Sequence, residues 1–290
     1  MRFSILAVGS LVLMTSLPAN AVILYATTDF RNLISFDSAA PGTLLSSAPI
    51  TGLVDTSEAV VGIDFRPADG RLYAWGNAPG SIYRLYTLNL TTGLATRVPG
   101  NVDLNRTGTN WGFDFNPQVD RIRIVSDANV SLRLDPNTGA LAADDTALNP
   151  SSSVNGVAYD RNDLNPATPT TLFGIDSASD QLVRIGGVDG TPSPNAGAVT
   201  NIGALGFNVI GSNGFDIGLN GIGYAALSIS APTPSNLYTI NLTTGGATLL
   251  GLIGNGQDGV RSLSALVPEP SNTLLALFAG LVLRLRRRRC

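Results

Sequence analysis

The chain has 290 residues, of which 44% are hydrophobic and only 13% charged, with 32 glycines, and this composition suits one large domain of many short strands. Residues 22–267 contain no lysine, and their 12 arginines against 20 carboxylates leave a net charge of −8, which argues against nucleic acid or an anionic membrane surface as a partner. Histidine is absent and the single cysteine is Cys290, so the body of the chain lacks the usual general base, the commonest metal ligand, a thiol nucleophile and any disulfide.

The first 21 residues are organised like a secretory signal peptide. Arg2 gives a positive start, an apolar run covers residues 5–17, and Ala19 and Ala21 form the small-x-small pattern that signal peptidase requires. We therefore expect cleavage after Ala21 and export of the remainder. The alternative is a retained membrane helix, for which the apolar run is short.

The middle of the chain contains an internal repeat. The segment GIDFRPADGRLYAWG from Gly62 is echoed by GFDFNPQVDRIRIVS from Gly112, and weaker copies begin at Gly156, Gly214 and Gly259. Each copy contains an alternating strand, a turn rich in Pro, Asp, Asn or Gly, a second strand, and a third strand that runs into a Thr-Gly turn. Four short strands per unit of about 40 to 50 residues are typical of a propeller blade.

The two ends of the repeat region complement each other. The last unit holds one strand before Pro268, whereas residues 24–28 and 33–45 supply the three strands that this unit lacks. The sequence therefore predicts an all-β propeller of five four-stranded blades over residues 22–267, closed by strands from both ends of the chain. A signal helix and a short C-terminal apolar helix are expected outside the ring. A six-bladed ring, a linear β-solenoid and a sandwich remain the alternatives, because periodicity does not establish closure.

The repeats also resemble a known family. The segments LYATTDFRNLISFDSAAPG, GIDFRPADGRLYA, GFDFNPQVDRIRIVS and LFGIDSASDQLVRI are similar to a secreted bacterial group, domain-of-unknown-function family 4394. The resemblance covers about residues 23 to 266. It implies the repeat fold and an extracellular location, and it carries no catalytic residue to this chain.

Three aspartates occupy one position of the repeat. Asp64, Asp114 and Asp216 each follow the anchoring glycine by two residues, whereas Ala158 takes that position in the unit that begins at Gly156 and Arg261 in the unit that begins at Gly259. If these strands line a central channel, the carboxylates form a partial acidic ring that could hold a cation or a sugar hydroxyl. In the alternative interpretation each Asp accepts backbone N–H groups of a neighbouring turn and fixes blade packing.

A second group of oxygen-bearing side chains lies in one loop. Asp160, Asn162 and Asp163 are spaced closely enough to be calcium ligands, and this is the one cofactor that the sequence suggests. The EF-hand pattern fails because Leu164 stands where an oxygen ligand is needed and no distal Glu follows. An ordinary turn with an insertion is the alternative.

The last 23 residues, 268–290, resemble the PEP-CTERM sorting signal of bacteria. Pro268, Glu269 and Pro270 precede an apolar run at 273–283, and an arginine cluster follows: Arg284, Arg286, Arg287, Arg288 and Arg289. In that family an exosortase recognises the tag and removes it near the Pro-Glu-Pro motif during delivery to the envelope or extracellular matrix. Eleven apolar residues span only about 16 Å as a helix, short of a roughly 30 Å hydrocarbon core, so we expect transient membrane contact. An ordinary short tail anchor is the alternative.

Three functions stay open at this point. The first is a non-catalytic binding or scaffold propeller, exported through signal peptidase and an exosortase-like enzyme, with extracellular polysaccharide as a partner. The second is a secreted carbohydrate-active hydrolase or lyase that uses a pair of the aspartates, since two carboxylates suffice for glycoside hydrolysis. The third is a self-associating matrix or surface-layer component.

Overall fold

The computed structural model describes residues 21–268 except 30, 81, 100–101, 104–107, 164, 166, 230–233 and 257–258. The expected signal helix and C-terminal apolar helix lie outside these residues. So do several of the predicted sorting and cleavage residues: Ala19, Glu269, Pro270, Arg286, Arg287, Arg288 and Arg289. Helices in the described part are limited to the short 3-10 segments Val188–Gly190 and Pro194–Ala196, and none of them could cross a membrane.

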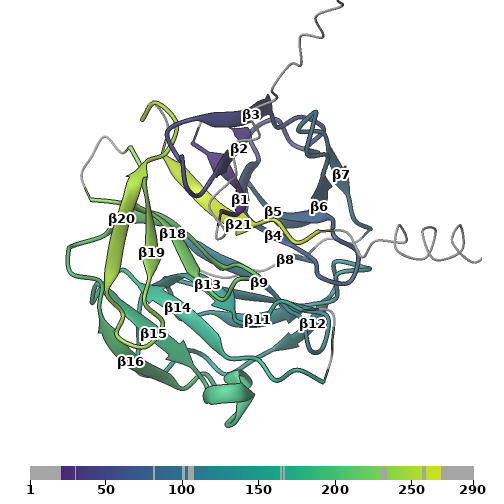
Figure 1. Cartoon of the computed structure of the whole chain (residues 1–290). Coiled ribbons are helices and arrows are strands. Elements are labelled where there is room, and N and C mark those ends of the chain that lie inside the picture. The colour runs from purple at the N-terminus through teal and green to yellow at the C-terminus, as the bar shows by residue number, and fades with distance from the viewer. Residues whose placement is uncertain are drawn as a thin grey trace, which may run out of the picture.

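Five antiparallel sheets of four strands surround a central axis (Figure 1). Blade 1 contains β4 Ala59–Phe65, β5 Leu72–Ala78, β6 Ile82–Leu88 and β7 Ala95–Arg97, and the short β8 Val102–Asp103 also pairs with β6. Blade 2 contains β9 Trp111–Asn116, β10 Arg121–Ser126, β11 Ser131–Leu134 and β12 Leu141–Asp144. Blade 3 contains β13 Val154–Tyr159, β14 Leu172–Asp176, β15 Gln181–Ile185 and β16 Val199–Ala204.

The remaining two blades complete the ring. Blade 4 contains β17 Ile210–Ile217, β18 Gly223–Ser228, β19 Asn236–Ile240 and β20 Ala247–Leu252. Blade 5 contains β21 Val260–Ala265, β1 Ile23–Thr28, β2 Asn32–Asp37 and β3 Leu44–Pro49. The first strand of each blade lies innermost, and the inner strands contact one another in the order β4, β9, β13, β17, β21 and back to β4.

Blade 5 is built from both ends of the chain. In Figure 1 the yellow β21 lies beside the purple β1, with Tyr25 opposite Ser264 and Ala26 opposite Leu263 in an antiparallel ladder. The chain thus closes its own ring by hydrogen bonding its first strand to its last. The five-bladed, ring-closed prediction is confirmed, and the six-bladed, solenoid and sandwich alternatives are wrong.

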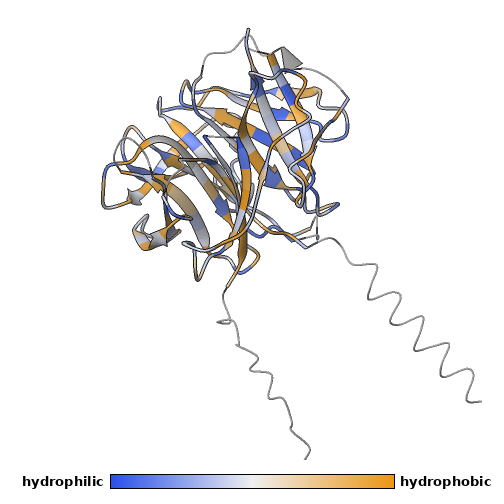
Figure 2. Ribbon diagram, turned by 90° about the horizontal axis from the view of Figure 1, so that it is seen from above, coloured by the Kyte–Doolittle hydropathy of each residue, from blue (hydrophilic) through white to orange (hydrophobic). Residues whose placement is uncertain are grey.

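The hydrophobic core lies between adjacent blades. Figure 2 shows hydrophobic residues distributed along the strands of the sheets instead of gathered at one centre. One cluster joins blades 1 and 2, where Tyr83 stacks on Trp75 with ring centroids 5.3 Å apart and meets the edge of Trp111 at 5.1 Å. Inner strands such as β13 are buried along their whole length, whereas the outer strand β3 is mostly exposed. This gradient explains why the inner strands have nearly continuous apolar sequences.

The repeated glycines allow the inner strands to approach. A Cβ on Gly62 would lie 2.5 Å from the Cβ of Phe113 in the next blade, and one on Gly214 would lie 2.6 Å from the backbone nitrogen of Leu263. A Cβ on Gly112 would lie 3.0 Å from a side-chain carbon of blade 3. Only a residue without a side chain fits at this spacing, so the repeat signal in the sequence records blade-to-blade packing.

Gly214→Ala is therefore expected to lower the free energy of unfolding by about 1–3 kcal/mol, because the new methyl group must displace backbone atoms of β21. Gly246 is the matched control. Its backbone φ is not positive, and its Cβ would meet nothing closer than the Thr244 hydroxyl at 3.6 Å, so Gly246→Ala is expected to leave stability unchanged or slightly raised. Denaturant unfolding of both variants provides the measurement, and equal losses would contradict the packing role.

The strand register corrects one position of the repeat. Ser264, and not Arg261, takes the fifth place in the axial ring, because Ser264 pairs with Tyr25 as Asp64 pairs with Tyr73. The sequence-based assignment was wrong because Gly259 lies before β21, which begins at Val260, instead of inside the strand. Arg261 lies at the start of β21 and forms an ion pair with Asp29. Ala158 occupies its expected place on β13.

Candidate functional site

The three repeat aspartates meet on the axis of the propeller. Asp64 comes from β4, Asp114 from β9 and Asp216 from β17, and one carboxylate oxygen of each lies within 4.8 Å of the others. The residues are only 1–2% exposed. The structure therefore brings together the side chains that the repeat placed in one position, but inside the packed centre of the ring.

Each carboxylate accepts a backbone N–H group from the next blade. In all three cases the donor is the residue that directly follows the equivalent axial position of the neighbouring inner strand. The pairs are Phe115 N to Asp64 Oδ2 at 2.8 Å, Tyr159 N to Asp114 Oδ2 at 2.8 Å, and Ala265 N to Asp216 Oδ2 at 2.6 Å. The aspartates thus bond one inner strand to the next. This role is closer to the fixing of blade packing through backbone N–H groups than to an acidic ring that holds a ligand.

Ser264 completes the connection across the closure. Its hydroxyl donates to Asp64 Oδ1 at 2.7 Å and lies 3.2 Å from Asp216 Oδ2, while the Phe65 N–H donates to Ser264 Oγ at 3.2 Å. Blades 4, 5 and 1 are linked through this one side chain. A serine serves here because blade 5 needs a donor toward two carboxylates, which a fourth aspartate does not supply.

Burial raises the pKa of all three carboxyl groups. Desolvation raises the pKa of Asp216 to about 6, and its N–H donors act against this rise. For Asp64, desolvation and then the charge of Asp216 raise the pKa well above its usual value, and for Asp114 desolvation and then the charge of Asp64 do the same. Uptake of a proton by either Asp64 or Asp114 relieves the repulsion between the neighbouring anions of this cluster.

The chemistry open to this cluster is limited by its partners. Retaining glycosidases hold two carboxyl groups about 5–5.5 Å apart across a substrate, and calcium takes about six to eight oxygen ligands. Here Asp64 and Asp216 each use both oxygens as acceptors for N–H or O–H donors. A substrate or cation would have to displace those donors, so the geometry favours a connection between blades. Ligand binding by the three aspartates stays a prediction.

In the loop proposed for calcium, two of the three side chains turn carboxylate oxygens to separate partners, whereas the buried Oδ1 of Asn162 has no hydrogen-bond partner among the described residues. Asp160 Oδ1 accepts the N–H of Thr171 at 2.6 Å, and Asp163 Oδ1 accepts the N–H of Asn165 at 2.8 Å. Asn162 is 3% exposed and donates from Nδ2 to a backbone carbonyl of blade 4 at 3.2 Å. These contacts are those of a hydrogen-bonded turn, and calcium binding by this loop stays a prediction.

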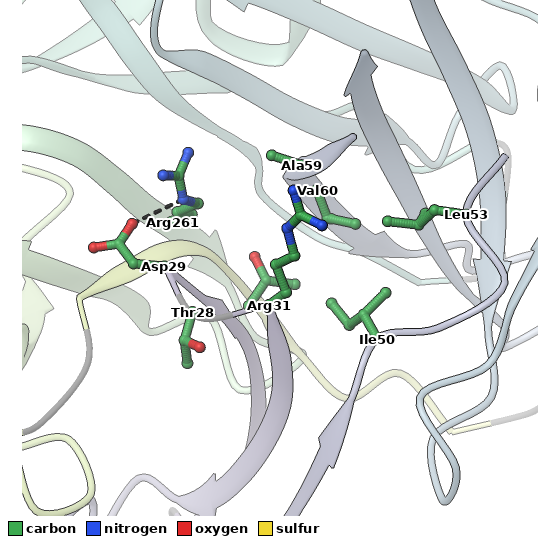
Figure 3. A pocket seen from close by; sticks show the side chains of 9 residues that line it. Thr28, Asp29, Arg31, Ile50, Leu53, Ala59, Val60 and Arg261 are labelled. Carbon is green, nitrogen blue, oxygen red and sulfur yellow. Dashed lines mark ion pairs between the residues drawn. The ribbon is translucent and has the colours of Figure 1, made fainter. Parts of the chain in front are cut away.

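A pocket of about 150 Å³ lies at the seam between blades 5 and 1, and sequence reasoning missed it. It is formed by the end of β1, the β1–β2 turn, the connection from β3 to β4, and the start of β21. Figure 3 shows Ile50 and Leu53 on one side and the charged side chains of Arg31, Asp29 and Arg261 on the other.

The charges of this seam pocket are unevenly paired. Arg261 Nε donates to Asp29 Oδ1 at 2.8 Å (Figure 3). The Arg31 guanidinium donates from Nη1 to the carbonyl of Thr56, and it has no carboxylate partner among the described residues. Because Arg31 and Arg261 lie far apart in the sequence and meet only through ring closure, no spacing pattern could have indicated this site.

Comparison with known proteins does not define an activity. No curated protein matches the chain. A solved structure provisionally assigned as a 6-phosphogluconolactonase, from Bacteroides uniformis, is 13% identical with a TM-score of 0.39, covering 81% of this chain and 83% of its own. A protein from Lactobacillus plantarum is 11% identical with a TM-score of 0.43, covering 84% of this chain and 99% of its own. Neither likeness carries a conclusion about activity. The profile described as "Domain of unknown function (DUF4394)" matches residues 32–264, and the chain therefore belongs to this family.

Proposed function

We propose that the protein is an exported, non-catalytic binding propeller that acts at the cell envelope or in an extracellular polysaccharide matrix. One contrast in the structure carries this proposal. The buried axial carboxylates are used as acceptors between blades, whereas the seam pocket presents an arginine that has no carboxylate partner in the described part of the chain, beside an apolar wall. Concave sites with an apolar wall and a few fixed polar groups are typical of small-ligand binding.

The exported location rests on the two ends of the chain. Signal peptidase would cleave after Ala21, and an exosortase-like enzyme would process the tag at residues 268–290, so contact with the membrane is transient. The acidic body, with a net charge of −8 over residues 22–267, supports an extracellular role without nucleic acid as a partner.

The hydrolase or lyase alternative receives less support from the geometry. Catalytic carboxyl groups have to reach the substrate within hydrogen-bonding distance. Asp64 and Asp216 are each 2% exposed and bonded to backbone N–H groups, and Asp114 is 1% exposed. Histidine and lysine, which could replace them as proton carriers, are absent from the body of the chain.

The test is a binding and turnover screen of the full-length chain against acidic and neutral polysaccharides. We expect saturable binding to at least one polysaccharide without any release of reducing ends or unsaturated products. Turnover of a polysaccharide, ester or phosphate substrate would overturn the non-catalytic assignment. Light scattering that grows with concentration, without polysaccharide binding, would instead favour self-association through outer strands, where Leu45 and Leu249 are each 58% exposed.

A further inference from the structure

We propose that the seam pocket between blades 5 and 1 binds a small organic monocarboxylate, such as the carboxylate-bearing ring of a uronic acid, through the Arg31 guanidinium and the Thr27 hydroxyl. This inference rests on the proposed binding function and names its ligand class. Three independent features of the pocket support it: the backbone of Arg31, the hydroxyl of Thr27, and the balance of charge and apolar surface.

Arg31 occupies a backbone conformation that does not suit it. It closes the turn between the second and third strands of blade 5 with φ 60°, and its N–H donates to the Thr28 carbonyl at 3.0 Å. The corresponding turn of blade 2 ends with Asn129 at φ 64° and the same N–H to carbonyl bond at 3.0 Å, and Asp180 at φ 56° precedes the third strand of blade 3. Asn and Asp tolerate the left-handed region, whereas Arg does not favour it.

The strain at Arg31 indicates that its side chain is needed for something other than the turn. A guanidinium carries five N–H donors in a planar fork that matches a carboxylate. One of these donors bonds to the Thr56 carbonyl and fixes the side chain over the pocket, beside Ala59 and Val60 (Figure 3). The remaining donors have no partner among the described residues, and a bound carboxylate would supply one.

Within the described part of the chain, Thr27 contributes a buried polar group without a hydrogen-bond partner to the same pocket. The residue lines the pocket and is 1% exposed, and its Oγ1 has no hydrogen-bond partner among the described residues. Buried hydroxyl groups almost always have partners, because an unpaired one is costly. A ligand oxygen in the pocket would satisfy this hydroxyl.

Charge and size restrict the ligand. Among the lining residues, Arg31 and Arg261 carry two positive charges and Asp29 one negative charge, and Asp55 in the neighbouring connection lies close enough to Arg31 for their charges to interact. This small positive excess suits a monoanion better than a phosphate dianion. A cavity of about 150 Å³ holds one small molecule or one ring of a larger one. Ile50, Leu53 and Val60 provide an apolar wall for the carbon skeleton of that ring.

Two substitutions in the full-length chain separate binding from folding. Arg31→Asn removes the guanidinium while supplying a residue that suits φ 60°, and Thr27→Val removes the hydroxyl while keeping the shape of the side chain. We expect calorimetric binding of glucuronate to weaken by about tenfold or more in Arg31→Asn and by about three- to tenfold in Thr27→Val. The Tm of both variants should stay unchanged or rise. The Arg31 guanidinium makes one hydrogen bond and the Thr27 hydroxyl none among the described residues, so their loss removes little stabilisation.

Glucose and inorganic phosphate serve as matched ligands, and Arg71→Asn as a matched variant. Arg71 is an exposed arginine that precedes β5 and ion-pairs with Asp69, so its loss should leave glucuronate binding unchanged. Glucuronate binding should exceed binding of glucose and of phosphate by about tenfold. The proposal is overturned if glucuronate binds no better than glucose, if phosphate binds more tightly, or if Arg31→Asn lowers the Tm and leaves affinity unchanged.

The same variants separate this inference from the proposed function. If wild type and Arg31→Asn bind an acidic polysaccharide equally, the chain is a binding propeller but the seam pocket is not its carboxylate site. If glucuronate binds through Arg31 while every polysaccharide fails, the pocket is assigned correctly and its natural ligand is a free sugar acid, so the matrix role is wrong.

Discussion

Replacement of Arg123 by alanine is expected to lower the free energy of unfolding by about 3–5 kcal/mol, the range seen when one partner of a buried ion pair is removed. Arg123 is 1% exposed. Its Nη1 donates to Asp145 Oδ2 at 2.6 Å and to Ser131 Oγ at 3.0 Å, and its Nη2 donates to Asn195 Oδ1 at 2.5 Å. Asp145 directly follows the last strand of blade 2 and its N–H donates to the Ser131 carbonyl, whereas Asn195 belongs to blade 3. The bond from Arg123 to Asn195 therefore connects blades 2 and 3.

Arg133→Ala is the matched control for this prediction. Arg133 bonds to the same carboxylate, with Nε 2.8 Å from Asp145 Oδ2 and Nη2 2.9 Å from Oδ1, but its side chain is 27% exposed. Solvent screens that pair, so its loss is expected to cost about 1 kcal/mol or less. Denaturant unfolding of the two single variants and the double variant measures both contributions. Similar losses from Arg123→Ala and Arg133→Ala would show that burial does not set the strength of this contact.

Periodicity explains why the sequence predicted the architecture. In three of the repeats a glycine and an aspartate sit where neighbouring inner strands touch, so close packing at Gly62, Gly112 and Gly214 leaves a pattern that the sequence alone reveals. Ring closure was predictable because the last unit lacked three strands and the region around Tyr25 supplied them. The axial meeting of three aspartates then followed from their common place in the repeat.

Features that break the repeat could not be predicted in the same way. In blade 5, Ser264 takes the place of the aspartate. The glycine that starts this unit in the sequence, Gly259, lies before β21 and so does not mark the axial position. Arg123 stands opposite Asp114 where the equivalent residue of blade 1 is Tyr73, so an alternating-strand pattern gives no sign that an arginine is buried there. Tertiary contacts specific to one pair of blades determine these positions, and local sequence does not encode them.

Stability is expected to rise as the pH falls from about 8 to about 5. Each axial carboxyl group has a higher pKa in the folded protein than in the unfolded chain, so the folded state binds more protons between pH 3.8 and the folded pKa values. The stabilisation is complete below the unfolded value of 3.8 and is lost as the pH rises through the folded values, about 6 for Asp216. The full shift of Asp216 alone corresponds to about 3 kcal/mol, which is reached only below pH 3.8; about half of it appears between pH 8 and pH 5, or roughly 3–6 °C in Tm.

Two asparagine variants locate this pH dependence within the axial cluster. Asp114 Oδ2 accepts the Tyr159 N–H, and an amide oxygen can accept the same bond, so Asp114→Asn keeps this contact without placing a negative charge beside Asp64. We expect Asp114→Asn to raise the Tm at pH 8 and to flatten the dependence of Tm on pH.

The second variant, Asp216→Asn, should have the opposite effect on stability. Both oxygens of Asp216 accept N–H groups, at 2.6 Å each, so an asparagine would turn its amide donor toward another donor. The free energy of unfolding should fall by about 1–3 kcal/mol. Thermal unfolding between pH 5 and 8 distinguishes the two, and an Asp114→Asn profile as steep as that of the wild type would contradict proton uptake by Asp114 in this pH range.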